Sequence, residues 1–157
     1  MDLKTEADAL RKVPMFAKLD ASKLKLVAFT SRLLTFEDEE ILFEQGDPSD
    51  SAYLVIEGDV EVLAGQGDDV VVAGVLGRNE LVGEMGVLAN APRSATIRAR
   101  GQVRALRIDG DLFLDLLAEN PSVALDVMRQ LSDKLARAHR QFELVQEELH
   151  RHRGASS

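Results

Sequence analysis

The chain has 157 residues, 45% of them hydrophobic, which suits a single domain whose core needs no metal or disulfide to hold it together. It contains no cysteine, which excludes disulfides, thiolate nucleophiles and cysteine-ligated metal centres. The formal net charge of −8, from 27 acidic and 19 basic residues, opposes direct binding to DNA or RNA.

The first predicted elements are short helices within residues 10–31. Apolar residues recur at helical spacing in residues 6–12 and 21–31, and Pro14 lies between the two runs. The sequence Asp20-Ala21-Ser22 is typical of a helix start, because an acidic side chain can cap the first turn. We therefore expect two helices before the first strand.

Residues 32–109 have the pattern of a mainly β region flanked by helices. Short runs of β-branched and apolar residues predict strands at 41–43, 53–56, 60–63, 70–76, 96–99 and 103–108. Glycine and polar residues predict turns at 46–47, 57–59, 65–69 and 101–102. Several short strands at this spacing predict an antiparallel β-barrel or sandwich.

Residues 111–151 are predicted to be helical. Leu112, Leu116 and Leu117 follow helical spacing, and Pro121 suits the first turn of a second, long helix that runs to about Arg151. Apolar residues of the long helix alternate spacings of three and four, as in a coiled-coil seam: Met128, Leu131, Leu135, Ala138, Phe142, Val145 and Leu149. A helix of ~30 residues extends ~45 Å, longer than the barrel can cover, so we expect a homodimer that pairs two copies of it.

The segment from Gly83 to Thr96, GEMGVLANAPRSAT, combines the parts needed to hold a sugar phosphate. Glycine allows a sharp turn and a close backbone approach, and residues 84–89 can form one helical turn whose free N–H groups attract an anion. Arg93 carries a planar guanidinium that can bind two phosphate oxygens at once. Glu84 would repel a phosphate, so it is expected to accept a hydrogen bond from a neutral group such as a sugar hydroxyl, or else to favour the helix start.

This segment resembles the phosphate-binding cassette of the cyclic nucleotide-binding domain family. The cassette reads G-E-x-(A/G)-x-L and then P-R-(S/T/A)-A-T, and the matching residues are Gly83, Glu84, Gly86, Leu88, Pro92, Arg93, Ser94, Ala95 and Thr96. Residues 36–62 also resemble the family's strands and glycine turns, so the resemblance covers about residues 10–150. It implies one domain over residues 1–157, with a jelly-roll β-barrel at 32–109, the cassette at 83–96, and lid and dimerisation helices at 111–151.

The resemblance also implies which residues bind the ligand: Gly83, Glu84, Met85, Gly86, Val87, Arg93, Ser94 and Ala95. The cyclic phosphate would contact Arg93 and the N–H groups of residues 85–87, while Glu84 would accept from the ribose 2′-OH. Serine at position 94 points weakly to cyclic AMP, with cyclic GMP as the alternative.

The long helix would cover the base, with Arg137, Ala138, His139 and Arg140 as candidate base contacts. Ala138 departs from the polar residues of the catabolite activator proteins and cannot hydrogen-bond a base. Arg137 has the alternative role of a solvated helix charge, and Ala138 that of a small seam residue.

These features predict a stand-alone cytoplasmic sensor rather than an enzyme. No G-x-S-x-G nucleophile motif occurs, the three histidines do not form a metal pattern, and no run of about 18 apolar residues suggests a membrane span. The chain ends at Ser157 without room for a helix-turn-helix, so movement of the C-terminal helix would signal to a separate, unidentified protein. The alternative is a scaffolding dimer of the same fold that no longer responds to nucleotide.

Overall fold

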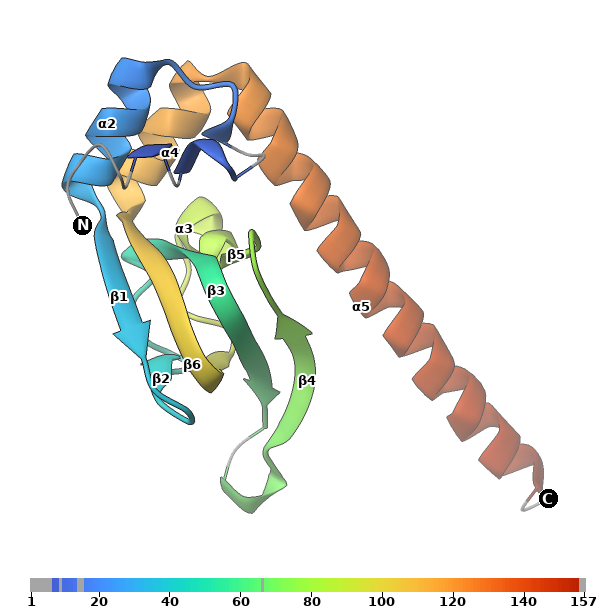
Figure 1. The fold of residues 1–157 in the computed structure, drawn as a ribbon. Helices are drawn as coiled ribbons and strands as arrows, with labels where there is room; N and C mark the ends of the chain where they lie inside the picture. Colours follow the sequence, from blue (N-terminus) through green and yellow to red (C-terminus); the bar gives the residue numbers. More distant parts are fainter. Residues whose placement is uncertain (1–6, 9, 14–15, 66, 156–157) are drawn as a thin grey trace.

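A six-stranded antiparallel sheet forms the centre of the computed structural model, which describes residues 7–8, 10–13, 16–65 and 67–155. Its strands are β1 (Arg32–Phe36), β2 (Ile41–Phe43), β3 (Ser51–Ala64), β4 (Val71–Leu76), β5 (Leu81–Val82) and β6 (Thr96–Asp109). The order is β1-β6-β3-β4, with β2 also on β6 and β5 also on β3 (Figure 1). This arrangement confirms the predicted antiparallel, mainly β fold with flanking helices.

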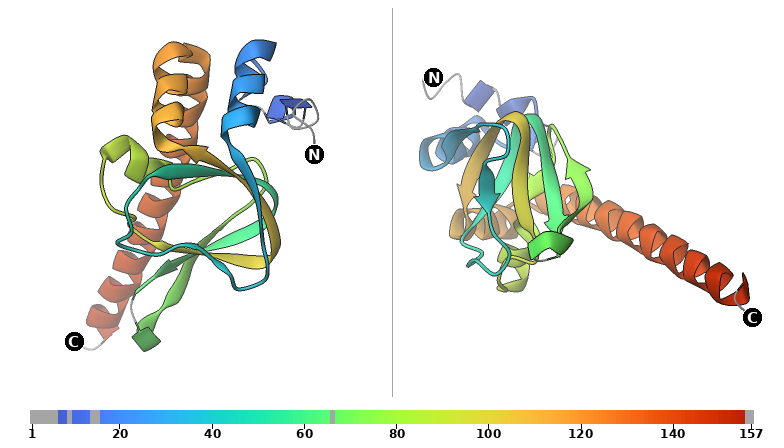
Figure 2. Two further views of the ribbon diagram at one scale, coloured as in Figure 1. Left: turned by 90° about the vertical axis from the view of Figure 1, so that its left-hand side faces the viewer. Right: turned by 90° about the horizontal axis from the view of Figure 1, so that it is seen from below.

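The sheet curls strongly but remains open. In the described part of the chain, β1 and β4 end the path of paired strands and do not pair with each other. Figure 2 shows the curled sheet from two further sides. The expected barrel is therefore an open roll, and one wall of its interior is left for other segments to complete.

The long strands β3 and β6 correct two of the predicted turns. They pair from Ser51 opposite Asp109 to Leu63 opposite Thr96, with register shifts around Glu57. Residues 57–59 and 101–102 lie inside these strands rather than in turns, close to the two shifts of register, and Gly58 and Gly101 have positive φ angles there. Bulges increase the twist of paired strands, which is consistent with the strong curl of this sheet.

Two clusters of buried apolar residues stabilise the fold. The first lies between the helices and one end of the sheet and includes Leu10, Phe16, Leu24, Val27, Leu54, Leu81, Ile108, Phe113 and Val123. The second fills the curled sheet and includes Leu42, Tyr53, Val55, Val60, Val82, Ile97, Ala99, Val103 and Ala105. The segment β5 contributes one residue to each cluster, which fixes the position of the cassette that follows it.

Four described helices and one 3-10 turn complete the fold: α2 (Ala21–Thr30), η2 (Gly67–Asp69), α3 (Glu84–Ala89), α4 (Gly110–Glu119) and α5 (Pro121–Ala155). Of the other predicted N-terminal helix, residues 7–8 and 10–11 are helical and the remainder lies outside the described residues. Asp20 precedes α2 as expected, but its side chain accepts no capping hydrogen bond from the described residues. Asp109 caps α4 by accepting from the N–H of Asp111 at 3.0 Å.

The helix α5 begins at Pro121 as predicted and extends well beyond the sheet (Figure 1). Of the predicted seam, Met128 and Leu135 are 55% and 60% exposed, whereas Leu131 packs partly against the first cluster. The side chains of the other predicted seam residues, Ala138, Phe142, Val145 and Leu149, lie outside the described residues. No described helix, α5 included, combines the length and the apolar character required to cross a bilayer.

Candidate functional site

A cavity of about 430 Å³ opens between the sheet, the cassette and α5. Seven of the predicted ligand-binding residues line it: Gly83, Glu84, Met85, Gly86, Arg93, Ser94 and Ala95. The eighth, Val87, instead packs into the first apolar cluster. The volume lies within the ~300–1,000 Å³ typical of small-molecule sites.

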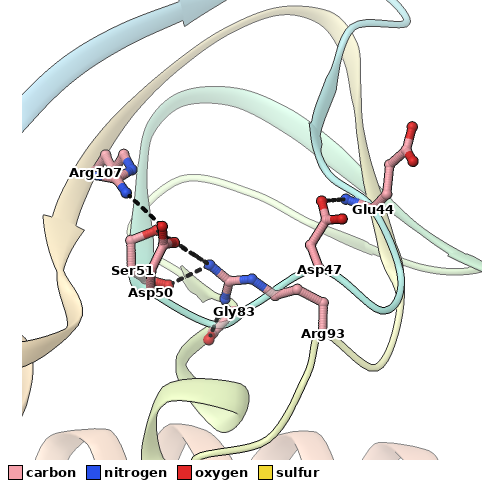
Figure 3. Close-up of polar contacts among 7 residues, drawn as sticks. All are labelled: Glu44, Asp47, Asp50, Ser51, Gly83, Arg93 and Arg107. Atoms are coloured by element: carbon pink, nitrogen blue, oxygen red, sulfur yellow. Dashed lines mark hydrogen bonds and ion pairs between the residues drawn. The ribbon is translucent and has the colours of Figure 1, made fainter.

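Arg93 is buried, with 4% of the residue exposed, and its guanidinium is fixed by the chain itself (Figure 3). Nη1 donates to the carbonyl of Gly83 at 2.9 Å, and Nη2 donates to the carbonyl and hydroxyl oxygens of Ser51 at 2.7 and 3.2 Å. The carboxylate of Asp50 lies 3.8 Å from Nη2 and also pairs with Arg107 at 3.3 Å. These contacts hold the guanidinium rigidly at the cavity wall.

The backbone and one aromatic ring also position Arg93. Its N–H donates to the carbonyl of Asp47, and its carbonyl accepts from Gly46, both at 2.8 Å. The turn that presents these groups is closed by Asp47, whose carboxylate accepts from the N–H of Glu44 at 3.0 Å (Figure 3). The ring of Phe43 lies under the guanidinium, 4.0 Å from ring centroid to Cζ, in cation–π geometry.

The Arg93 guanidinium is a cation whose hydrogen-bonding capacity is not fully used. Burial lowers its pKa from the usual value, and the charge of Asp50 opposes that shift. Arginine is nevertheless always protonated in proteins, so the site carries a positive charge at neutral pH. Nε is buried and has no hydrogen-bond partner in the part of the chain that the structure describes. A buried donor without a partner costs ~1–3 kcal/mol, and an anionic ligand oxygen would relieve that cost.

Glu84 is the first residue of α3 and is 2% exposed. Its Oε1 accepts from Nζ of Lys134 on α5 at 2.6 Å, and the same ammonium donates to the carbonyl of Leu81 at 2.6 Å. A buried carboxylate requires such a partner, because moving an unpaired charge out of water costs on the order of several kcal/mol per ion. An ion pair with Lys134 therefore holds this carboxylate on the cavity wall.

Glycine at position 83 is required by its surroundings. Its φ is 81°, in the left-handed region. A Cβ atom there would collide with Nη1 of Arg93 and lie 3.1 Å from the ring of Phe43. At Gly86 a Cβ would instead collide with Oγ of Ser49. At both glycines the close neighbours are atoms of the chain itself, and the predicted close approach to a ligand stays a prediction.

The candidate base contacts on α5 differ in their positions relative to the cavity. Arg137 lines the cavity, and its guanidinium lies 3.5 Å from the carboxylate of Glu80. His139 is exposed and pairs with Glu143 at 2.9 Å. Neither His139 nor the exposed Arg140 is among the described residues that line the cavity. The side chain of Ala138 lies outside the described residues.

The sequence patterns did not predict three contacts of this site, those made by Phe43, Ser51 and Lys134. Phe43 and Ser51 reach Arg93 only through the fold, and Ser51 is 42 residues away from it in sequence. Lys134 had a detectable signal, because it precedes Arg137 by one helical turn and therefore shares its face. A lysine on the cavity side of α5 could have been paired with the acidic residue of the cassette.

Comparisons with known proteins identify the domain family and the fold of this chain. Residues 33–120 match the family described as the cyclic nucleotide-binding domain. A protein of Rhodopseudomonas palustris with a provisional potassium channel name is 31% identical over 126 residues, which cover 80% of this chain and 30% of that protein. The chain therefore spans less than a third of the length of this curated relative.

Two solved structures show the same fold. The sensor domain of the transcriptional regulator DNR from Pseudomonas aeruginosa has a TM-score of 0.73 at 20% identity, over 87% of this chain and 92% of that one. A cAMP-binding acyltransferase from Mycobacterium smegmatis has a TM-score of 0.65 at 28% identity, over 73% of this chain and 36% of that one. The first likeness concerns the fold alone.

Proposed function

The chain belongs to the cyclic nucleotide-binding domain family, and we propose that its cavity binds a 3′,5′-cyclic nucleotide, with cyclic AMP preferred to cyclic GMP. One observation carries the proposal. The buried guanidinium of Arg93 has an Nε donor without a partner, on the wall of the cavity that Glu84 also lines. This pairing of a phosphate-binding group and a hydroxyl-binding group suits a cyclised sugar phosphate.

The phosphate is proposed to bind at Arg93. A guanidinium forms short, charge-assisted hydrogen bonds with phosphate oxygens, and these are about twice as strong as neutral ones. Contacts to Gly83, Ser51 and Phe43 already fix the orientation of the side chain, so little rotamer entropy is lost when the ligand binds. Ser94 and Ala95 line the cavity beside it and would complete the phosphate subsite.

The electrostatics of the cavity favour an anion although the whole chain is acidic. Of the charged residues lining it, Arg93, Lys134 and Arg137 are positive and only Glu84 is negative among those the structure describes. Charges that are partly buried are screened by salt much less than charges at the surface. Lys134 and Arg137 are paired with Glu84 and Glu80, so the proposed attraction of an anion comes chiefly from the buried Arg93 guanidinium, despite the net charge of −8 on the whole chain.

The ribose and the base are proposed to occupy the rest of the cavity. Glu84 would accept from the ribose 2′-OH, while Val62, Val75 and Leu76 provide an apolar wall for a purine. Arg137 is the α5 residue placed to contact the base edge or face. The adenine preference rests on Ser94 and on the likeness to the cAMP-binding acyltransferase.

The proposed role is regulatory rather than catalytic. We propose that the protein acts in the cytoplasm and that a separate protein receives the signal. The cavity lies against α5, so a ligand that prefers one position of this helix would shift its population. The exposed Leu135 supports the further proposal of a homodimer through α5. The downstream partner would then read the position or pairing of the helix.

One observation favours a second candidate function, a scaffold that does not respond to nucleotide. Both charged groups of the cassette already have partners within the chain, because Glu84 pairs with Lys134 and Arg93 bonds to Gly83 and Ser51. Thermal melts separate the two functions. A ligand at 100 times its Kd adds ~2.7 kcal/mol to the folded state, whereas a scaffold would melt at an unchanged temperature.

Isothermal titration calorimetry with cyclic AMP, cyclic GMP and 5′-AMP tests the proposed ligand class. We expect both cyclic nucleotides to bind, cyclic AMP more tightly, and 5′-AMP to bind at least ~10-fold more weakly, a difference of about 1.4 kcal/mol. The absence of binding by either cyclic nucleotide, or equal affinity for 5′-AMP, would contradict the proposal.

A further inference from the structure

Lys134 connects the cassette to α5 through two short hydrogen bonds. Its ammonium donates to Oε1 of Glu84 and to the carbonyl of Leu81, both at 2.6 Å. No other hydrogen bond to the Glu84 carboxylate is made by the residues that the structure describes. Lys134 therefore sets both the charge balance and the orientation of this carboxylate.

The same face of α5 makes two further polar contacts with residues 80–84. Gln130, one turn before Lys134, accepts from the N–H of Leu81 at 3.4 Å, and Arg137, one turn after it, pairs with Glu80 at 3.5 Å. Residues spaced by three or four lie on one side of a helix, so these contacts form a continuous row. The central contact in this row, at Lys134, is the shortest of the three.

Polar contacts rather than apolar packing hold this part of α5 in place. Val123 and Val127 are buried in the first cluster, but Met128 and Leu135 are mostly exposed. Past the partly packed Leu131, the described contacts of α5 with the cassette are therefore ionic or hydrogen-bonded. Docking of this segment then depends strongly on the link between Lys134 and Glu84.

We propose that Lys134 is a positioning residue that aims Glu84 at the ribose hydroxyl and thereby couples ribose recognition to the docking of α5. This inference rests on the proposed function, because it adds Lys134 to Glu84 as the second residue of the proposed ribose subsite. Lys134 acts through Glu84, and the contact with the ligand is made by the carboxylate.

The geometry favours a shared carboxylate over competition between Lys134 and the ribose. A carboxylate has two oxygens and about four lone-pair sites, and Lys134 is hydrogen-bonded to Oε1 only. The remaining capacity is sufficient for one hydroxyl donor. The ammonium also neutralises Glu84, which would otherwise repel the phosphate held by Arg93 in the same cavity. Loss of Lys134 should therefore weaken ligand binding rather than strengthen it.

The link to α5 is tested first without ligand, by hydrogen exchange of the backbone amides of residues 128–137. We expect faster exchange in Lys134→Met and in Glu84→Gln, because each removes one partner of the link. The double variant should exchange no faster than either single variant, since both changes break the same contact. Arg129→Met is the matched control, because Arg129 lies on the same helix and, among the described residues, its ion pair is with Asp126. Exchange unchanged in both single variants would refute the docking role.

The positioning role is tested with the ligand, by comparing cyclic AMP with its 2′-deoxy analogue in calorimetry. A hydrogen bond to a charged group is worth a factor of ~10 to ~100, so the wild-type chain and Arg129→Met should prefer cyclic AMP by about that ratio. In Lys134→Met the ratio should fall below ~5, and Lys134→Arg should restore most of it. A merely structural lysine would change both affinities equally and leave the ratio intact.

The outcomes separate this inference from the proposed function. A ratio in Lys134→Met within about twofold of wild type, or tighter binding of cyclic AMP by this variant, would overturn the positioning role. If the wild-type chain binds no cyclic nucleotide, the proposed function fails and the ribose role of Lys134 fails with it. The exchange measurement still decides independently whether Lys134 docks α5.

Discussion

Replacing Arg93 with methionine removes the proposed phosphate-binding charge while keeping a long side chain in place. The guanidinium makes hydrogen bonds of 2.9 Å to Gly83 and 2.7 Å to Ser51, and it is almost completely desolvated. Loss of one partner of such a desolvated pair typically costs ~2–5 kcal/mol of binding free energy. The affinity for cyclic AMP should therefore fall by ~30-fold to several thousand-fold.

The effect of this substitution on folding should be smaller. Losing the buried hydrogen bonds costs ~1–3 kcal/mol, but burial of the charged group is itself unfavourable, as the lowered pKa of Arg93 indicates. Methionine recovers part of that cost, since it needs no desolvated charge. A binding loss clearly larger than the stability loss would separate the ligand-binding role from a structural one.

The assay is calorimetric titration with cyclic AMP, together with urea unfolding of each variant. Arg100→Met is the matched control, because Arg100 is exposed on β6, away from the cavity. Arg93→Lys is a second variant that keeps the charge but not the planar fork, and it should bind cyclic AMP with intermediate affinity. A folded Arg93→Met variant whose Kd for cyclic AMP stays within about threefold of wild type would refute the reasoning.

Three other substitutions test the surrounding geometry. Gly83→Ala should lower the free energy of unfolding by ~1–3 kcal/mol, because a side chain at its φ of 81° is strained and meets Arg93; an unchanged urea midpoint would contradict this. Phe43→Leu removes the ring under the guanidinium and should weaken cyclic AMP binding by ~2-fold to ~30-fold in calorimetry, whereas unchanged affinity would assign the ring no part. Leu135→Glu places a charge in the proposed seam and should convert the dimer to monomers in sedimentation velocity; a persisting dimer would place the interface elsewhere.

Local patterns predicted the elements that depend on local chemistry. Pro121 marked the start of α5, and Gly83 with Glu84 marked the start of α3, because first-turn preferences act over a few residues. The motif also placed Arg93, Glu84, Ser94 and Ala95 together, and the structure brings them to one cavity. A sequence motif can therefore predict which residues share a site when one short segment supplies most of them.

Gly58 and Gly101, which lie inside β3 and β6, show where a local pattern does not predict the structure. Glycine with positive φ serves equally in a turn and in a bulge, so the residue type alone does not reveal whether the strand continues. The decision depends on the partner strand, and the two shifts of register lie on either side of Glu57, where β3 and β6 pair with each other. The same dependence on distant pairing determines whether a sheet closes, which is why an open roll was predicted as a barrel.

The contacts of Lys134, Ser51 and Phe43 were not predicted because they join segments far apart in the chain. Helical spacing showed which α5 residues share a face but not which face meets the cassette. For the same reason His139 and Arg140 were placed beside Arg137 as candidate base contacts, while of the three only Arg137 lies at the cavity in the described structure. Packing of α4 and α5 against the first cluster decides the rotation of the helix.

The Nε–H signal of Arg93 in a ¹H–¹⁵N correlation spectrum reports directly on the proposed phosphate contact, since this donor has no partner in the described structure. The signal can be assigned by its loss in Arg93→Lys. Saturating cyclic AMP should move it downfield, because a charge-assisted hydrogen bond to a phosphate oxygen forms. An Nε–H signal that keeps its ligand-free position at saturating cyclic AMP would contradict the central claim.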